Sequence, residues 1–447
     1  MSGAGIAFER AAHVLGGRLA GAAVHHEGRC AWLSFDVDES NPAGSVIETS
    51  TGPDLYGGTA GIALALSYLA SGGSDPVVAA AARGGLRHAL ANVGDDVSLQ
   101  MGRAGVALAA LVAGRLLEDA DIVAGGADLA REVADVSTRG SSTGEWDLIA
   151  GDAGIALALT SFAEETADPD HLGAAVQTAD RLADAGLDTS YGTCWPSPSA
   201  DAPGLVGLGH GTSGAALALA TVADRAGRGD LAARAADALR YERVWSHAMW
   251  GWPDLRGVTG ARAGRTSLPY PTQWCHGSAG AGIARARMLR LPVMTGLLGE
   301  SCLTEVAAAV EVSTTTTLRQ LATPDTGLPN LSICHGVGSV AELHLECHLT
   351  SGDQEHLDHA RRLTLAGLGV PEELRGAWLD GSVSETDLAA PLERIACGLP
   401  GGPEVPGLML GLAGVVVLLL RLADPASVPA PGLGADTADG SRTRLLR

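Results

Sequence analysis

A short glycine pattern recurs seven times along this chain and constrains its fold more than any other feature. Each copy reads Gly-x-x-Gly, or a close variant, and is followed by small or apolar residues, as in GTAGIALAL. The copies begin at Gly58, Gly102, Gly151, Gly211, Gly277, Gly336 and Gly411. The copy at Gly336, GVGSVAEL, is degenerate. A repeat of this length indicates that the chain is built from similar units that pack on one another.

Each copy predicts the start of a buried helix. The first glycine stands near the N-cap, and the second allows the new helix to approach its neighbour closely. The residues that follow are small or apolar on every side, which is typical of a helix without a solvent-facing side. Amphipathic stretches such as 75–93 and 171–187 lie between the copies and predict outer helices. We therefore expect an all-α fold, an α/α toroid of seven inner and seven outer helices. The pattern alone also fits a helical repeat without chemistry.

The composition excludes several classes of partner. The net charge is −21, and all 30 basic residues are arginine, so we expect no nucleic-acid partner. The most apolar run, 407–420, is shorter than the roughly 20 residues that a membrane span needs, so we do not expect an integral membrane protein. The seven cysteines are widely spaced, and the first residues do not resemble a signal peptide. We therefore expect a cytoplasmic protein without a disulfide framework.

The repeats also set the expected domain organisation. We expect one domain over residues 1–424 and a disordered tail over 425–447, because the last residues are rich in Pro, Gly, Ala and Asp. Two irregular stretches, 249–273 and 369–407, interrupt the pattern. We expect them at the ends of the ring, where binding sites are usually built.

The tripeptide Cys-His-Gly occurs twice, each time at the start of a predicted inner helix. Cys275 and His276 stand in QWCHGSAG, and Cys334 and His335 stand in SICHGVGS. Because inner helices begin at one end of a ring, these side chains should lie close together. Two thiolates and one imidazole would make a three-ligand zinc site with a fourth position open. The alternative is a pair of inert cysteines, since free Cys packs like a small hydrophobic residue.

Two other helix starts carry candidate acid–base groups. His210 stands in GLGHG, and Asp147 stands in EWDLIAGDAG. Both should face the same end of the ring, where they could transfer protons beside a bound metal. Asp147 could instead be a helix cap, and His210 a hydrogen-bonded core histidine. The four histidines between 344 and 359 lie in a polar helical stretch, and we expect them to be surface residues.

The motifs WCHG, CHG and GLGHG, together with the glycine repeats, resemble the lanthionine synthetase C-like (LanC-like) family over roughly residues 50–420. The resemblance implies an α/α toroid of seven inner and seven outer helices. It implies that Cys275, Cys334 and His335 hold a zinc ion. It further implies that His210 is an acid–base residue and that Asp147 is an active-site aspartate.

The resemblance leaves two positions unassigned. Some family members carry an arginine a few residues before the Trp-Cys motif, and PYPTQWC has none. Arg256, Arg262 or Arg265 could take its place. His276 follows the first cysteine as in several branches of the family, whereas other branches have tyrosine there.

The activity that the resemblance implies is that of a zinc-dependent peptide cyclase. Such an enzyme adds cysteine thiols to dehydroalanine or dehydrobutyrine and forms lanthionine or methyllanthionine thioether rings. The implied partners are a dehydrated precursor peptide with its leader, an export transporter, and a separate dehydratase, because 447 residues are too few for a dehydratase domain beside the ring.

Three alternatives stay open. A family member could couple another thiol, such as glutathione, to dehydro residues. A non-catalytic scaffold could keep the toroid and the zinc. A glycosidase or a terpene cyclase could use a similar toroid, but aromatic residues make up only 4% of the chain. Asp147 and Asp152 are the acidic residues near the helix starts, whereas a glycosidase needs two carboxylates across a cleft.

Overall fold

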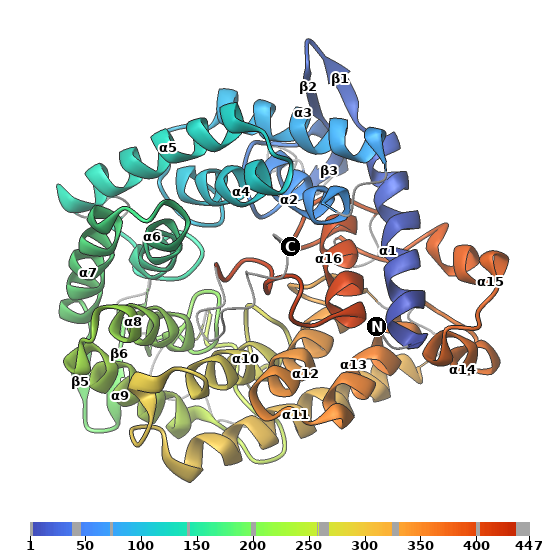
Figure 1. Cartoon of the computed structure of the whole chain (residues 1–447). Helices are drawn as coiled ribbons and strands as arrows, with labels where there is room; N and C mark the ends of the chain where they lie inside the picture. The colour runs from blue at the N-terminus through green and yellow to red at the C-terminus, as the bar shows by residue number, and fades with distance from the viewer. Residues whose placement is uncertain are drawn as a thin grey trace.

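The computed structural model describes residues 3–37, 46–71, 75–140, 144–197, 203–256, 258, 268–323, 330–398 and 403–434. Within these ranges the helices form a ring of two concentric layers (Figure 1). The inner layer consists of α2 (Thr59–Ala70), α4 (Arg103–Leu116), α6 (Asp152–Thr166), α8 (Thr212–Ala226), α10 (Ser278–Leu289), α12 (Val337–Ser351) and α16 (Leu412–Ala423). The outer layer consists of α1 (Gly3–Gly21), α3 (Pro76–Asn92), α5 (Ala120–Thr138), α7 (Pro169–Asp184), α9 (Gly229–Trp245), α11 (Gly299–Leu321) and α13 (Gln354–Gly367). The predicted α/α toroid is confirmed.

The two ends of the chain close the ring. Each inner helix packs against the next one in chain order, and α16 completes the circle by contacting both α12 and α2. The N-terminal helix α1 is the outer partner of α16, so the first and last helices of the ring are neighbours (Figure 1). Across the described ranges, none of the helices has both the length and the apolar character that crossing a bilayer requires.

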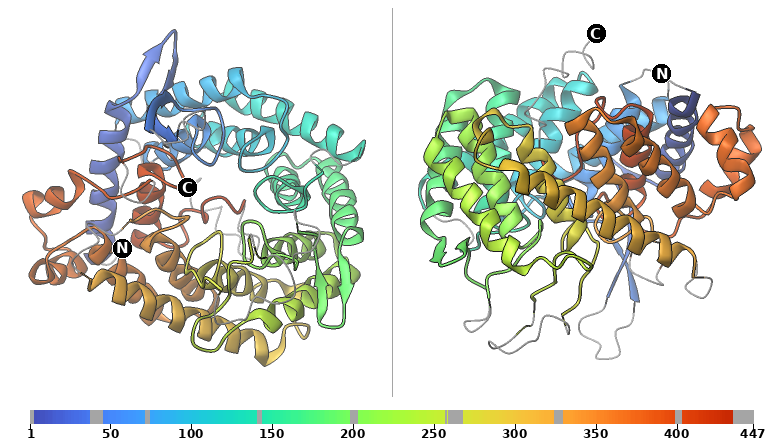
Figure 2. Two further views of the ribbon diagram at one scale, coloured as in Figure 1. Left: turned by 180° about the vertical axis from the view of Figure 1, so that it is seen from behind. Right: turned by 90° about the horizontal axis from the view of Figure 1, so that it is seen from below.

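Shorter elements extend from the two layers. The strands pair as antiparallel hairpins: β1 (Val24–His26) with β2 (Arg29–Ala31), β3 (Leu33–Val37) with β4 (Val46–Ser50), and β5 (Leu187–Thr189) with β6 (Gly192–Cys194). The remaining helices are η2 (Pro292–Met294), α14 (Glu372–Asp380), α15 (Glu385–Ala389) and η4 (Ala390–Leu392). Since β4 leads directly into the loop before α2, the β3–β4 ribbon marks the end of the ring where inner helices begin (Figure 2, right).

The two irregular stretches differ from each other in structure. The stretch 369–407 contains α14, α15 and η4, which pack outside the ring against α1. The stretch 249–273 is described at 249–256, 258 and 268–273, and these residues form loops. Only the second stretch leads directly into a Cys-His-Gly motif.

Inner and outer helices begin in different ways. Aspartate side chains accept backbone N–H bonds at the starts of four outer helices, and these caps are Asp75, Asp119, Asp168 and Asp353. Each inner helix instead follows a glycine without a side-chain cap. The second glycine of the repeat is required by close packing: a Cβ on Gly154 would lie 2.2 Å from the carbonyl oxygen of Leu148 and 2.9 Å from Cβ of Leu99 in the preceding repeat.

Seven backbone hydrogen bonds join the loops before the inner helices into a closed circle. Each bond runs from a peptide N–H of one loop to a carbonyl oxygen of the next. The donor and acceptor pairs are Tyr56–Gln100 (3.0 Å), Gln100–Ile149 (3.2 Å), Leu148–Gly209 (3.1 Å), Gly209–Cys275 (2.9 Å), Trp274–Cys334 (3.0 Å), Cys334–Met409 (2.9 Å) and Met409–Tyr56 (2.9 Å). This circle holds all seven loops in one register at one end of the ring.

Buried charges accompany the degenerate repeat. Glu342 and Glu346 of α12 lie inside the protein, where an unpaired carboxylate would be costly. Arg421 of α16 pairs with both, at 3.1 and 2.8 Å, and Arg290 next to α10 pairs with Glu346 at 2.7 Å. Three successive inner repeats are therefore connected by ion pairs in addition to apolar contacts.

His344 departs from the expectation that the histidines between 344 and 359 are surface residues. It is 1% exposed, because it lies on the inner helix α12. Its Nε2 lies 2.9 Å from Thr314 Oγ1, and its Nδ1 lies 3.1 Å from His356 Nδ1. The glycine copy at Gly336 predicts this inner helix, and the polar composition of the stretch misleadingly suggested a surface position for His344.

The C-terminal segment 425–434 corrects the prediction of a disordered tail from residue 425. These residues enter the middle of the ring (Figure 1). Arg421 Nη1 donates to the carbonyl oxygen of Val428, and Gln100 Nε2 donates to that of Gly432, both at 2.7 Å. The composition suggested disorder, but the apolar lumen offers this segment a surface to bury against. Residues 435–447 lie outside the described ranges.

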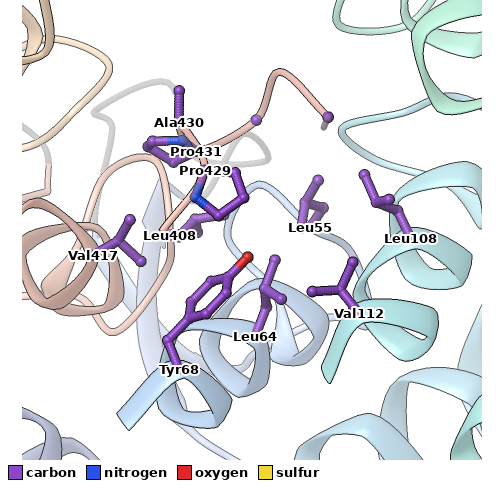
Figure 3. A pocket seen from close by; sticks show the side chains of 12 residues that line it. Leu55, Leu64, Tyr68, Leu108, Val112, Leu408, Val417, Pro429, Ala430 and Pro431 are labelled. Carbon is purple, nitrogen blue, oxygen red and sulfur yellow. The ribbon is translucent and has the colours of Figure 1, made fainter. Parts of the chain in front are cut away.

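The segment leaves little empty space in this part of the lumen. A cavity of about 40 Å³ remains between Pro429 and Ala430 on one side and Leu64, Tyr68 and Val112 on the other (Figure 3). The inside of the ring is therefore filled here by the chain itself.

The packing of the second glycine leads to a stability prediction. Gly154→Ala should lower the free energy of unfolding by about 1–3 kcal/mol, because the new methyl group overlaps the loop and the preceding repeat. Gly173→Ala on α7 is the matched control, since a Cβ there meets nothing within 4 Å. The control should gain about 0.5–1 kcal/mol. Denaturant unfolding measures both, and equal stabilities would contradict the explanation.

Candidate active site

Cys275, Cys334 and His335 lie together where the inner helices begin. One ligand atom from each, two sulfurs and an imidazole nitrogen, lies within 4.8 Å of the others. Both cysteines are buried and His335 is exposed. In the part of the chain that the structure describes, no other group of three His, Cys, Asp or Glu residues meets this spacing. The set fits a zinc ion, because two sulfurs and one nitrogen are a known donor set of open zinc sites.

The two sulfurs influence each other's ionisation. A hydrogen bond between the thiol groups lowers the pKa of Cys275, and the charge of Arg256 adds to this effect. The same bond, together with burial, raises the pKa of Cys334. Cys275 therefore loses its proton more easily than Cys334, whereas a divalent cation bound by both sulfurs would favour the loss of both protons.

His210 and Asp147 form a hydrogen-bonded pair beside this cluster. Asp147 is 9% exposed, and its Oδ2 bonds to Nδ1 of His210. Its Oδ1 accepts the N–H of Ala150 at 2.7 Å, so the same carboxylate also caps its own loop. Burial alone lowers the pKa of His210, but the bond to Asp147 and the charges of Asp147 and Cys275 outweigh it and raise this pKa. The His210 imidazole therefore binds a proton more strongly than an unperturbed histidine does.

His276 and Arg256 complete the surroundings. The His276 ring stacks on that of His210, with centroids 5.5 Å apart, and is 1% exposed. Burial and the Arg256 charge lower the pKa of His276 to about 4, so its imidazole is neutral at pH 7. The Arg256 guanidinium is held by Asp254, with Nη2 to Oδ2 at 2.7 Å and Nε to Oδ1 at 3.1 Å. Of the three candidate arginines, Arg262 and Arg265 lie outside the described residues.

The thiols and the imidazoles of the site occupy different positions within the repeat. Cys275 and Cys334 stand two residues before the helix-starting glycine and are buried. His210, His276 and His335 stand one residue before it. Since the backbone circle gives all seven loops the same register, equivalent positions present their side chains in equivalent ways. Thiols and imidazoles are thereby placed next to each other.

Sequence reasoning missed two residues near the cluster. Tyr56 is half-buried, and its hydroxyl lies 3.1 Å from Cys334 Sγ. Burial and the neighbouring thiols raise the pKa of Tyr56, so its hydroxyl stays protonated. Asp254, which orients Arg256, was the other omission. The signal for Tyr56 was available, because it stands two residues before Gly58, as each cysteine does before its own glycine. For Asp254 we find no such signal in the sequence.

Together the fold and the site define an α/α toroid with a cluster of two cysteines and one histidine, spaced as metal ligands are, next to a hydrogen-bonded histidine–aspartate pair. The sequence pattern described as "Lanthionine synthetase C-like protein" matches residues 49–433. The chain therefore belongs to the lanthionine synthetase C-like family.

One solved structure, that of nisin cyclase, agrees on the fold. Nisin cyclase is similar with a TM-score of 0.55 and 16% identity, over 85% of this chain and 90% of that chain. A family 76 glycoside hydrolase from a bovine Bacteroides thetaiotaomicron strain gives a TM-score of 0.44 and 12% identity, over 93% of this chain and 77% of that chain. An unsaturated glucuronyl hydrolase specific for heparin gives a TM-score of 0.41 and 14% identity, over 72% of this chain and 85% of that chain. Comparison with curated proteins finds no match.

The His210–Asp147 pair leads to a prediction about pH. In Asp147→Asn the amide oxygen can still accept the Ala150 N–H, but the carboxylate charge is lost. The pKa of His210 should fall from above about 6.5 to below it, because burial is the largest influence on this pKa and the bond to Asp147 no longer opposes it. NMR titration of the His210 ring measures this change.

The sign of the associated stability change follows from linkage. The raised pKa in the folded protein means that protonated His210 adds stability fully below about pH 6.5. This contribution disappears as the pH rises through the folded pKa, and Asp147→Asn should abolish it. An unchanged His210 titration in the variant would argue against the pair.

Proposed function

We propose that this protein is a zinc-dependent peptide cyclase that adds cysteine thiols to dehydroalanine or dehydrobutyrine residues and forms (methyl)lanthionine rings. The observation that carries the proposal is the Cys275–Cys334–His335 cluster beside the His210–Asp147 pair. Membership of the family supports the class of reaction. The same site would also accept another thiol, such as glutathione, or hold zinc without turnover.

Cys275, Cys334 and His335 would hold the zinc ion. The ion would supply Lewis-acid chemistry that lowers the pKa of a substrate thiol, so that the thiol would react as a thiolate. Burial of the two cysteines keeps water away from their sulfurs. His335 is the exposed ligand of the three, and we assign the entry of the peptide to its side of the cluster.

In this proposal His210 and Asp147 carry out the proton transfer. In the proposed addition, the substrate sulfur bonds to Cβ, the Cα–Cβ double bond becomes single, and Cα gains a proton. Protonated His210 donates this proton from Nε2, because Asp147 occupies Nδ1. The proton that the substrate thiol gave up returns His210 to its acid form, so none is gained or lost overall.

The negative charge that develops on the substrate during the addition also needs a cation to stabilise it. Negative charge builds on the acyl oxygen as sulfur attacks Cβ. Arg256 is the cation whose charge acts on Cys275, His276 and His335 together. We assign it the stabilisation of this charge. Asp254 fixes the guanidinium and leaves part of its N–H groups for the substrate.

The proposed reaction defines the partners. The substrate is a dehydrated precursor peptide with a leader, and a dehydratase must supply its dehydro residues. A cytoplasmic location suits this supply and the later passage of the product to an export transporter. The −21 net charge of the chain is consistent with the expected absence of a nucleic-acid partner.

Metal content tests the first part of the proposal. The purified protein should contain about one zinc per chain, and Cys275→Ala and Cys334→Ala should each lose it, because two ligands do not hold the ion tightly. Cys397→Ala removes a buried cysteine outside the cluster and should keep the metal. Elemental analysis of folded samples decides the matter, and a folded wild type without zinc would overturn the metal site.

Turnover tests the second part. Cyclisation of a dehydrated peptide consumes its free thiols, which mass spectrometry detects as lost alkylation by N-ethylmaleimide. His210→Ala should keep the zinc and slow cyclisation by about 10²–10⁴-fold, since it removes the proton donor. His13→Ala, an exposed histidine on α1, is the control.

Added glutathione separates the alternatives in the same assay. Coupling to glutathione increases the peptide mass, whereas cyclisation leaves it unchanged. A zinc-loaded protein that performs neither reaction on any dehydrated peptide would support a non-catalytic scaffold.

A further inference from the structure

Tyr56 occupies the same place in its repeat as the two cysteines of the cluster. Tyr56, Cys275 and Cys334 each stand two residues before the glycine that starts an inner helix. All three belong to the circle of backbone hydrogen bonds. The repeat geometry therefore brings the Tyr56 side chain toward the sulfurs.

The backbone holds Tyr56 and Cys334 rigidly with respect to each other. The N–H of Met409 donates to the carbonyl oxygen of Tyr56, and the carbonyl oxygen of Met409 accepts the N–H of Cys334, both at 2.9 Å. The Tyr56 N–H is bound to Gln100 at 3.0 Å. One residue, Met409, thus bridges the two loops, and the 3.1 Å contact from the hydroxyl to Cys334 Sγ rests on fixed backbone.

The metal-bound state sets the direction of this hydrogen bond. A thiolate has no proton, so it can only accept, and the phenol O–H must donate. Cys334 is buried, with 1% of its surface exposed, so water does not compete for its sulfur. Hydrogen bonds to metal ligands change ligand basicity and are part of what tunes a metal site.

We propose that Tyr56 is a positioning residue of the metal centre, whose hydroxyl donates a hydrogen bond to the Cys334 thiolate and limits the charge that this sulfur gives to the metal. The inference rests on the proposed zinc site. Tyr56 acts through Cys334 and is not assigned contact with the substrate. With less charge donated by Cys334, the metal stays more electron-poor toward the incoming thiol.

Cobalt(II) in place of zinc makes this sulfur visible, because thiolate-to-cobalt charge transfer absorbs in the near ultraviolet. In Tyr56→Phe the sulfur loses the hydrogen bond and releases its electrons more easily. The band of the cobalt protein should therefore move to longer wavelength. Zinc affinity, measured by competition with a chromophoric chelator, should fall about tenfold, because the buried thiolate loses the hydrogen bond that stabilises and positions it against competing protons.

Tyr241→Phe is the matched control. Its hydroxyl is buried and donates at 2.9 Å to the carbonyl oxygen of Gly204, which is not a residue of the cluster. This variant should lose similar stability and leave the cobalt band and the zinc affinity unchanged. A Tyr56→Phe protein that binds cobalt with the wild-type band position would overturn the inference.

Two further outcomes are distinguishable. A folded wild type that takes up neither cobalt nor zinc would overturn the proposed metal site, and this inference with it. Where Tyr56→Phe does not fold, 3-fluorotyrosine replaces all 5 tyrosines and makes each hydroxyl a stronger donor. The cobalt band should then move to shorter wavelength, and an unchanged band would again count against Tyr56.

Discussion

The circle of seven backbone hydrogen bonds is the constraint on which the rest of this structure depends. It joins every loop that precedes an inner helix and runs through Tyr56, Cys275 and Cys334 themselves. A backbone circle requires all loops to have the same register. The side chains of equivalent positions then meet at one end of the ring, although they are far apart in the chain.

Shared register also explains why the site mixes thiols and imidazoles. The position two residues before the helix-starting glycine carries the buried thiols, and the position one residue before it carries the imidazoles. Cys334 and His335 can therefore be neighbours in sequence and still contribute to one cluster with Cys275. Electrostatics then differentiates the imidazoles: Asp147 raises the pKa of His210, whereas burial and Arg256 keep His276 neutral.

Much of this arrangement could be predicted from the sequence. The seven glycine repeats predicted the seven inner helices. Glycine is required in the repeat because a Cβ at positions such as Gly154 would collide with the preceding loop. The same repeats indicated that the Cys-His-Gly motifs would meet. For Asp147 the sequence indicates either a helix cap or an acid–base group, and in the structure one carboxylate oxygen accepts the Ala150 N–H while the other bonds to His210. The roles of these residues in catalysis stay predictions.

Predictions from local composition were wrong where the rest of the fold supplies a surface against which the segment or side chain is buried. The segment 425–434 looked disordered, but the lumen provides apolar side chains and Gln100 to receive it. His344 looked exposed, but α12 lies in the inner layer. For the segment 425–434 the deciding partners are distant in the chain, so a local pattern could not reveal them. For His344 the copy at Gly336 predicts the inner helix, and only the polar composition of the stretch argued against burial.

The sequence by itself determined the glycine repeat, the small residues that close helix packing requires, and the chemical types of the side chains at the helix starts. Only the tertiary structure decided which of these side chains touch. The contact of Tyr56 with Cys334, the attachment of Arg256 to Asp254 and the stacking of His276 on His210 all depend on distances between loops. Those distances are fixed by ring closure, which is a property of the whole chain and of no single repeat.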